Sequence, residues 1–248
     1  MTSADVREVL GIIGGTGPQG RGLGARWALA GHQVHIGSRS VERAQAAVDD
    51  IVERVGRDDL DIHAGTNEDV TAAAEIVVVA VPYDAQRELL PPLRDVVGDK
   101  VVCNVVNPMV FDDVGPKAVP VEEGSSAEEC QALWPDARVV SAFHDVSSRR
   151  LLTVHEPIDT HVLICSDDQE AAHRVSHLAS RIQGMWGVYC GPLRNSEYIE
   201  NVTPVILFIN RYYRIQAGLL IDGIERDPEA LHAHRAAGAT RAGRKPRS

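Results

Sequence analysis

Short apolar runs alternate along the first half of the chain with longer segments whose apolar residues recur at helical spacing. The runs at 9–13, 76–81 and 101–106 contain no charged residue, which is typical of strands in a parallel sheet covered on both faces. Segments 23–30 and 41–55 have the helical pattern. The alternation predicts an α/β fold of the Rossmann type, with a doubly wound parallel sheet.

A smaller unit follows in the second half of the chain. Its pattern predicts a strand at 161–166, a helix at about 169–182 and a strand at 187–190. A longer helix is expected over 197–221, because large apolar residues recur there at near-helical spacing. Pro204 predicts a kink in this helix, since proline removes one helical hydrogen bond. We expect the helix to pack against the first domain or against a second subunit.

These patterns divide the chain into three parts. We predict a Rossmann domain at 1–147, a smaller C-terminal α/β-helical domain at 148–225, and a basic, unpacked tail at 226–248. Within the first domain, 66–69 is interpreted as a polar turn. Segment 111–126 is rich in Asp, Gly, Pro and Glu, which predicts a long loop and makes it a candidate lid over a binding site.

A glycine fingerprint stands between the first strand and the first helix. Its first glycine permits a tight turn, its second lets the backbone approach a pyrophosphate, and its third lets helix and strand pack closely. Free N–H groups at the helix start would face the anion. The G-x-G-x-x-G motif and its intervening residues are Gly15, Thr16, Gly17, Pro18, Gln19 and Gly20. The order strand, glycine turn, helix predicts a dinucleotide site.

The end of the second strand indicates which dinucleotide is bound. An NAD site usually places a carboxylate there, beside the adenosine ribose. This chain instead offers Ser38 and Arg39, with Arg43 one helical turn later. Two guanidinium groups and a hydroxyl suit a 2′-phosphate dianion. We therefore predict NADP as the cofactor.

The carboxyl ends of further strands should line the nicotinamide, because ligands of open parallel sheets collect at that edge. The residues expected there are Val81, Pro82, Tyr83, Asn107 and Met109. The strand at 137–144 brings His144 to the same edge. His144 is either a site residue or a strand-end histidine whose hydrogen bonds the backbone satisfies.

Charge and composition exclude several classes of function. The formal net charge of −10 argues against a nucleic-acid partner. The apolar runs are too short to span a membrane, and the N-terminus lacks a signal pattern, so a cytoplasmic location is expected. Four cysteines stand far apart without a C-x-x-C pair, which indicates buried thiols and no metal site.

Several motifs together resemble a known family, the NADPH-dependent reductases of coenzyme F-420, which is an 8-hydroxy-5-deazaflavin. The resemblance extends from about Leu10 to Leu220. The shared motifs are the glycine fingerprint, Gly37-Ser38-Arg39 with Arg43, Val81-Pro82, Ser141-Ala142-Phe143-His144, and Gly191-Pro192-Leu193-x-Asn195-Ser196-x-x-x-Glu200-x-x-Thr203-Pro204.

The resemblance implies hydride transfer between NADP(H) and coenzyme F-420. It places the pyrophosphate at Gly15 to Gly20 and the 2′-phosphate at Thr16, Ser38, Arg39 and Arg43. It also implies a homodimer and small-molecule cofactor substrates. The residues that it places near the two rings are Asn107, His144, Ser148, Ala217 and Gly218. This chain departs from the family at Asp145, where similar proteins usually carry a proline-containing turn, and the carboxylate adds negative charge beside an anionic ligand.

Two alternatives remain open at the level of the sequence. One is an NADP-dependent reductase of another small acceptor, such as an imine, a ketone or a ferric chelate, which would require a proton donor near the nicotinamide. The other is a non-catalytic module that senses the redox state of NADP(H).

No nucleophile is required for hydride exchange between two cofactors, and the sequence contains no Ser-His-Asp set that would supply one.

Overall fold

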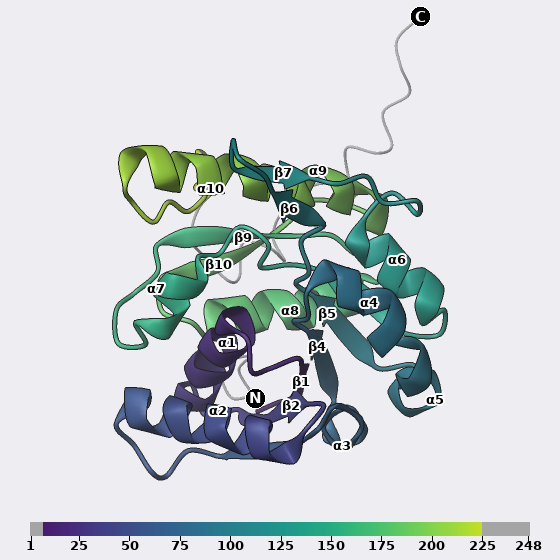
Figure 1. The fold of residues 1–248 in the computed structure, drawn as a ribbon, viewed down its shortest axis with the longest axis vertical. Helices are drawn as coiled ribbons and strands as arrows, with labels where there is room; N and C mark the ends of the chain where they lie inside the picture. The colour runs from purple at the N-terminus through teal and green to yellow at the C-terminus, as the bar shows by residue number, and fades with distance from the viewer. Residues whose placement is uncertain (1–6, 225–248) are drawn as a thin grey trace, which may run out of the picture.

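The structure is a computed structural model that describes residues 7–224 (Figure 1). The predicted basic tail at 226–248 lies outside the described residues. The elements, in chain order, are β1 (Val9–Ile13), α1 (Pro18–Leu29), β2 (Gln33–Ser38), α2 (Val41–Val55), β3 (Ile62–Thr66), α3 (Asn67–Ala73), β4 (Ile76–Val79), α4 (Tyr83–Leu89), η2 (Pro91–Leu93), α5 (Arg94–Val97), β5 (Val101–Asn104), β6 (Met109–Phe111), β7 (Pro116–Ala118), α6 (Ser126–Leu133), β8 (Arg138–Ser141), α7 (Ser148–Leu152), β9 (Thr160–Ile164), α8 (Gln169–Ser180), β10 (Met185–Tyr189), η3 (Leu193–Asn195), α9 (Ser196–Glu200) and α10 (Val202–Tyr213).

Six parallel strands form the central sheet in the order β3-β2-β1-β4-β5-β8. The register pairs Ile12 of β1 with Ile36 on one side and with Val78 on the other. This is the strand order of the Rossmann fold, in which two halves of the sheet wind outward from a central pair of strands. The predicted fold class is confirmed.

Both faces of the sheet are covered, which explains why its strands are apolar at successive positions. In β4, Ile76 and Val78 belong to one core cluster, with α1, α2 and α8, whereas Val77 and Val79 belong to the other. The second cluster also contains residues of α5 and α6, and partly buried residues of α4 pack against it. Figure 1 shows the two helical layers on either side of the sheet. Alternate side chains of a strand point to opposite faces, so both must be apolar.

The second unit shares a core with the first. Its parallel pair β9–β10 is connected through α8, and residues of α8 and β10 lie in the same cluster as α1. The indole of Trp27 donates to the Leu178 carbonyl at 3.0 Å, and an antiparallel bridge joins Ser141 to Cys165. The domain boundary at residues 147 and 148 stays a prediction.

Sequence predictions of local structure are corrected in the C-terminal unit and in the segment before it. Segment 111–126 is not simply a long loop, because an antiparallel hairpin of β6 and β7 begins it and α6 starts at its end. The helix predicted over 197–221 is two helices, α9 and α10, and the chain after 214 is irregular. The helical break falls at Asn201, which leaves Pro204 in the first turn of α10, where a backbone N–H is not needed. Within the described residues, no helix is long and apolar enough to cross a membrane.

Candidate cofactor site

The glycine turn between β1 and α1 brings three backbone segments into contact. The Gly15 N–H donates to the carbonyls of Ile12 at 3.2 Å and Gly37 at 2.9 Å. Gly14 has a φ of +69°, a conformation that glycine adopts without strain. A Cβ on Gly20 would lie 2.7 Å from the Gly15 Cα. The third glycine of the fingerprint is therefore required for the close approach of helix and turn.

The first turn of α1 leaves its backbone N–H groups free for an anion. Gly17 is the N-cap residue and provides no side-chain cap, and Pro18 occupies the first helical turn. A Cβ on Gly17 would meet only the Gly14 carbonyl oxygen, at 3.8 Å. Uncapped N–H groups at a helix N-terminus bind phosphate, so the turn fits a pyrophosphate.

The predicted 2′-phosphate residues lie at the end of β2 and the start of α2. Ser38 is 6% exposed, whereas Arg39 and Arg43 are exposed. Neither guanidinium makes a hydrogen bond or an ion pair within residues 7–224. The hydroxyl of Ser40 caps α2 by accepting the Arg43 N–H at 3.4 Å. Two uncommitted guanidinium groups beside a helix N-terminus fit a phosphate dianion.

The carboxyl end of β4 leads directly into α4. Val81 is buried, Pro82 is the N-cap residue of α4, and Tyr83 begins the helix. The Tyr83 hydroxyl donates to the Glu129 carboxylate at 3.2 Å. Burial and the negative charge of Glu129 raise the pKa of Tyr83. This contact attaches the predicted nicotinamide edge to α6.

The turn after β8 is held by side chains from three elements. Phe143 is fully buried with a φ of +62°, a conformation that is strained for an aromatic residue and is often found at functional sites. Its carbonyl accepts from Gln19 Nε2 at 3.2 Å. The His144 carbonyl accepts from Asn107 Nδ2 at 3.2 Å and from Thr203 Oγ1 at 3.0 Å. The turn therefore connects the start of α1, the end of β5 and the start of α10.

The imidazole of His144 points into the protein. It is 3% exposed, and its Nε2 lies 2.8 Å from Ser141 Oγ. Burial lowers the pKa of His144 to about 3, because the interior disfavours the charged form. His144 is therefore neutral at pH 7 and contributes its backbone carbonyl to the turn.

The sequence predicts that the Asp145 carboxylate adds negative charge beside an anionic ligand. In the structure, this side chain is instead buried. It is 3% exposed, and neither carboxyl oxygen has a hydrogen-bond partner within residues 7–224. Burial raises the pKa of Asp145 to about 7. The carboxyl group is consequently neutral for a large fraction of molecules at neutral pH.

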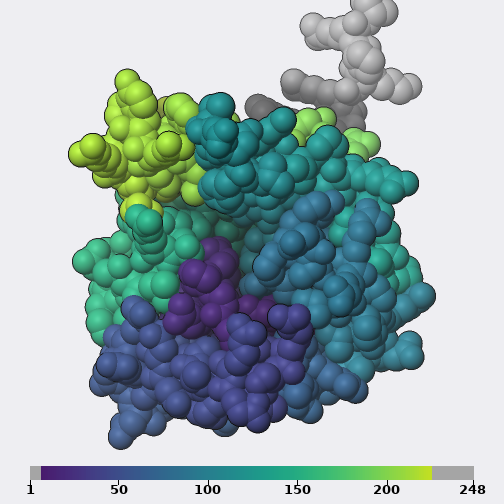
Figure 2. Space-filling model, viewed as in Figure 1, coloured from purple at the N-terminus to yellow at the C-terminus, as the bar shows by residue number. Residues whose placement is uncertain are grey.

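The remaining predicted residues lie on two neighbouring segments. The Ser147 hydroxyl donates to Gln216 Oε1 at 2.6 Å, which brings Ser148 and Ala217 to the same region. The Ala217 N–H donates to Asn210 Oδ1 at 2.6 Å. Figure 2 shows the surface hollowed beside the purple N-terminal segment, between the green and blue-teal parts of the chain.

Gly218 lies against β9. A Cβ on Gly218 would come within 2.6 Å of Thr160 Oγ1, and the same hydroxyl oxygen accepts the Leu219 N–H at 3.0 Å. The His161 N–H donates to the Leu219 carbonyl at 2.7 Å. We call the segment from 214 to 221 the return segment, because it runs back from α10 along β9.

Comparisons with known proteins agree with these features. A family model described as NADP oxidoreductase coenzyme F420-dependent matches residues 9–108. The F420-dependent NADP reductase of Methanothermobacter thermautotrophicus is 38% identical over 221 residues, which cover 87% of this chain and 95% of that protein. The reductase of the same name from Methanocaldococcus jannaschii is 31% identical, with 87% and 99% covered.

The chain belongs to the F420-dependent NADP reductase family. A crystal structure from Arthrobacter sp. FB24 has a TM-score of 0.73 at 21% identity and covers 86% of this chain and 100% of its own, which supports the fold. Metalloreductase STEAP3 of Rattus norvegicus is 27% identical over 193 residues, which cover 78% of this chain but 36% of that protein.

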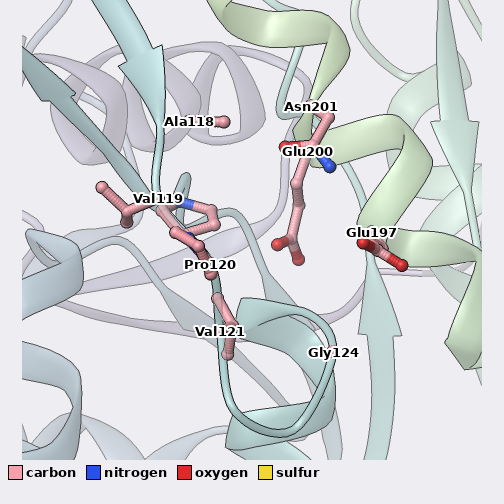
Figure 3. A pocket seen from close by; sticks show the side chains of 9 residues that line it. Ala118, Val119, Pro120, Val121, Gly124, Glu197, Glu200 and Asn201 are labelled. Atoms are coloured by element: carbon pink, nitrogen blue, oxygen red, sulfur yellow. The ribbon is translucent and has the colours of Figure 1, made fainter.

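A pocket of about 270 Å³, which the sequence did not predict, lies between α9 and the segment after β7. Val119 and Val121 contribute to one wall, and Glu197, Glu200 and Asn201 line the side formed by α9 and its end (Figure 3). Pro108, which lies between the predicted site residues Asn107 and Met109, also lines the pocket. The pocket therefore adjoins the segment predicted to line the nicotinamide.

Glu200 of this pocket connects α9 to α6. It is 3% exposed, and its carboxylate accepts the N–H groups of Ser126 at 2.8 Å and Ala127 at 3.1 Å. Burial raises the pKa of Glu200 to about 8, although both backbone hydrogen bonds act in the opposite direction. Neither Glu200 nor Thr203 was predicted as a site residue, yet both belong to the motif that carries the family resemblance.

The prediction of buried thiols is confirmed for three of the four cysteines. Cys103, Cys130 and Cys165 are fully buried, and Cys190 is partly buried. Burial raises the pKa of Cys103 and Cys165, so these groups remain neutral thiols. No group of three metal-ligating side chains is found among the described residues.

Proposed function

We propose that this chain transfers a hydride between NADP(H) and coenzyme F-420. The observation that carries the proposal is the pair of uncommitted guanidinium groups, Arg39 and Arg43, beside a glycine turn in a chain that belongs to the F420-dependent NADP reductase family. Ser38 adds a hydroxyl donor at the same place. A charge-assisted hydrogen bond contributes about 1.5 to 3 kcal/mol, which is enough to favour NADP over NAD.

The proposed mechanism is mainly one of orientation. The nicotinamide and the deazaflavin, when bound, would supply the chemistry of hydride exchange between them. The N–H groups at the start of α1 would hold the pyrophosphate, and Arg39 and Arg43 would hold the 2′-phosphate. Holding two reactants in the reactive orientation can lower the activation free energy by roughly 7 to 11 kcal/mol. No nucleophile or metal ligand is needed from the protein.

The ring-binding residues form the second part of the proposal. Thr16 lies in the glycine turn, Val81 and Pro82 follow β4, Asn107 follows β5, and Met109 is the first residue of β6. Ser148 at the start of α7, together with Ala217 and Gly218 of the return segment, would complete the ring site from the C-terminal unit. The turn after β8, which contains His144, would separate the nicotinamide part of the site from the deazaflavin part. We call the deazaflavin part the acceptor side.

We also propose that the enzyme is a cytoplasmic homodimer with a two-domain organisation. Support for a dimer comes from α10, the last helix of the described C-terminal unit, which fully buries only Thr203 and Ile206. Val205, Phe208, Tyr212 and Tyr213 are exposed, whereas Val202, Leu207 and Ile209 are half-buried. Exposed apolar patches of this kind commonly mark protein interfaces.

The direct test mixes the purified protein with NADPH and coenzyme F-420 and follows the visible absorbance of the deazaflavin. The proposal predicts bleaching that depends on both NADPH and protein. Absence of any change between pH 5 and 9, with NADPH binding intact, would refute hydride transfer and would favour a sensing module.

A ferric chelate is the second candidate acceptor, because the match to metalloreductase STEAP3 covers 78% of this chain, although it covers only 36% of that protein. An assay with NADPH and ferric citrate separates the two. Reduction of iron without reduction of the deazaflavin would favour the second candidate, and the reverse result would exclude it.

A further inference from the structure

One face of α1 contacts the turn after β8 and the helix that follows it, α7. The residues of this face are Gln19, Gly22 and Arg26, whose spacing of three and four residues places them one above the other on the helix. Gln19 lies in the first turn of α1 and donates to the Phe143 carbonyl at 3.2 Å. The helix whose start would hold the pyrophosphate is therefore also attached to the turn that contains His144.

The helix α7 packs directly against this face of α1 (Figure 1). A Cβ on Gly22 would lie 2.5 Å from the Leu151 Cβ, so the two helices approach each other as closely as a glycine allows. The first residue of α7 is Ser148, a predicted ring residue, and its N-cap Ser147 donates to Gln216 of the return segment at 2.6 Å. The position of α7 consequently sets the position of the acceptor side.

The guanidinium of Arg26 holds the other end of α7. Arg26 is 5% exposed, and its hydrogen bonds to main-chain carbonyls are between 2.7 and 3.0 Å long. The four carbonyls belong to Arg150, Leu151, Thr153 and Glu156, in the last turn of α7 and the chain after it. Because a guanidinium presents its donors in one fixed plane, a single side chain of α1 orients the end of α7.

Arg26 keeps its positive charge in this buried position. Burial and the charge of Arg150 lower the pKa of Arg26 to about 10, which is still well above neutral pH. Hydrogen bonds from a charged donor are shorter and stronger than those between neutral groups, and four of them converge on one short segment. The contact therefore resists movement of α7 along α1 as well as away from it.

We propose that Arg26 is a positioning residue for hydride transfer, which acts through α7 to hold the acceptor side at a fixed distance from the nicotinamide. In this role, which rests on the proposed function, α1 would contact the dinucleotide at its first turn and α7 along its side. The reaction moves a hydride from NADPH to the deazaflavin, which takes one further proton from water, and Arg26 exchanges no proton or electron. The reacting atoms must lie about 3 to 3.5 Å apart, and a displacement of about 1 Å can lower the rate roughly 100-fold.

The first experiment measures the attachment of α7 in the full chain without ligands. Hydrogen exchange of segment 148–156, where the N–H groups of Leu151 and Thr153 are hydrogen-bonded, is compared between wild type and Arg26→Met by mass spectrometry. We expect exchange to be about tenfold faster in the variant, and unchanged in the glycine turn at 14–20. Arg181→Met is the matched control, because Arg181 donates at 2.9 Å to the carbonyl of Ala30 at the end of α1, and its segment 148–156 should exchange as in wild type.

The second experiment separates binding from transfer. Equilibrium titrations of Arg26→Met should show NADP affinity within about twofold of wild type and coenzyme F-420 affinity at least about fivefold weaker. The single-turnover rate of hydride transfer, with both cofactors saturating, should fall about 10- to 100-fold. A lower rate at saturation with intact NADP binding indicates misorientation, which a general loss of stability would not produce.

Gly22→Ala tests the same role with Arg26 in place. Its Cβ would push α7 away from α1, so it should also lower the transfer rate at saturation and leave NADP affinity unchanged. This variant decides the proposal if Arg26→Met does not fold. Normal transfer by a folded Gly22→Ala would then overturn the role of α1.

Each contrary result has its own meaning. Wild-type hydrogen exchange and wild-type transfer rate in Arg26→Met would overturn the role of Arg26, and so would equal losses in Arg181→Met. A folded Arg26→Met that loses NADP binding would also overturn it, because Arg26 would then support the whole fold. A wild-type protein that transfers no hydride to coenzyme F-420 would refute the proposed function and the positioning role together, whatever the hydrogen exchange of α7.

Discussion

The NADP side and the acceptor side of the candidate site are built in different ways. On the NADP side, the glycine turn and the end of β2 belong to the central sheet, and its close contacts are between backbone atoms such as those of Gly15 and Gly37. On the acceptor side, the return segment depends on single side chains such as Thr160 and Asn210. The geometry of the NADP side therefore depends mainly on backbone packing, whereas the position of the return segment depends on a few side-chain hydrogen bonds.

Gly20→Ala should have the largest effect, because it breaks the backbone approach on the NADP side. The new Cβ would lie 2.7 Å from the Gly15 Cα, so the start of α1 must move. We expect calorimetry to show NADP binding weakened about 100-fold or more, together with a loss of roughly 1 to 3 kcal/mol in stability. Gly17→Ala is the matched control for stability, since its Cβ meets only one atom, at 3.8 Å. Wild-type NADP binding by Gly20→Ala would contradict the close-packing argument.

Asp145→Asn should stabilise the protein in a pH-dependent way. The folded-state pKa of Asp145 is raised to about 7, above its unfolded value of about 3.9. Ionisation of the buried carboxyl therefore costs stability increasingly as pH rises from about 4 to 7. Relative to wild type, the variant should gain roughly 2 kcal/mol between pH 5 and pH 8. Chemical denaturation at pH 5 and at pH 8 measures the free energy of unfolding of both proteins. A difference between variant and wild type that does not change with pH would contradict the raised pKa of Asp145 and show that its carboxylate has a partner.

Thr203→Val removes a hydroxyl that lies 3.0 Å from the His144 carbonyl and 2.9 Å from Asn107 Oδ1. Loss of one buried hydrogen bond should weaken coenzyme F-420 binding about tenfold, with NADP binding within about twofold of wild type. Thr203→Ser keeps the hydroxyl and should bind as wild type does. Equal losses for both cofactors would show that the two sides are not built separately.

His144→Asn should have the smallest effect on hydride exchange. The imidazole is buried and neutral at pH 7, so it supplies no proton at that pH. We expect kcat for NADPH and coenzyme F-420 to fall by about threefold at most, through adjustment of the turn. Loss of turnover by a factor of about 100 would instead assign a proton-transfer role to His144 and favour a ketone or imine as the acceptor.

Patterns of local sequence predicted the central fold well. The boundaries of α2 follow directly from the helical pattern and from Gly56, which ends the helix with a φ of +68°. The polar turn expected at 66–69 is instead the start of α3, where Thr66 and Asp69 form a capping box. A Thr three residues before an acidic residue is a signal for a helix start, so this error was avoidable.

Contacts between distant segments explain what could not be predicted. The burial of Asp145 and the attachment of His144 to Thr203 depend on how the second unit packs, and neither has a periodic signal. The β6–β7 hairpin was obscured by the polar composition of 111–126. The candidate site residues in the glycine turn and at the end of β2 could be proposed from local sequence because a fixed local geometry accompanies such motifs, whereas Ser148, Ala217 and Gly218 were suggested only by resemblance.

The most direct test of the account is calorimetric titration of the wild type and of Arg39→Ala with NADP and with NAD. We predict that the wild type binds NADP at least tenfold more tightly than NAD, and that Arg39→Ala loses roughly 10- to 100-fold in NADP affinity with NAD binding unchanged. Equal affinities of the wild type for the two dinucleotides would contradict the central claim that exposed, uncommitted arginines at the end of β2 select the 2′-phosphate.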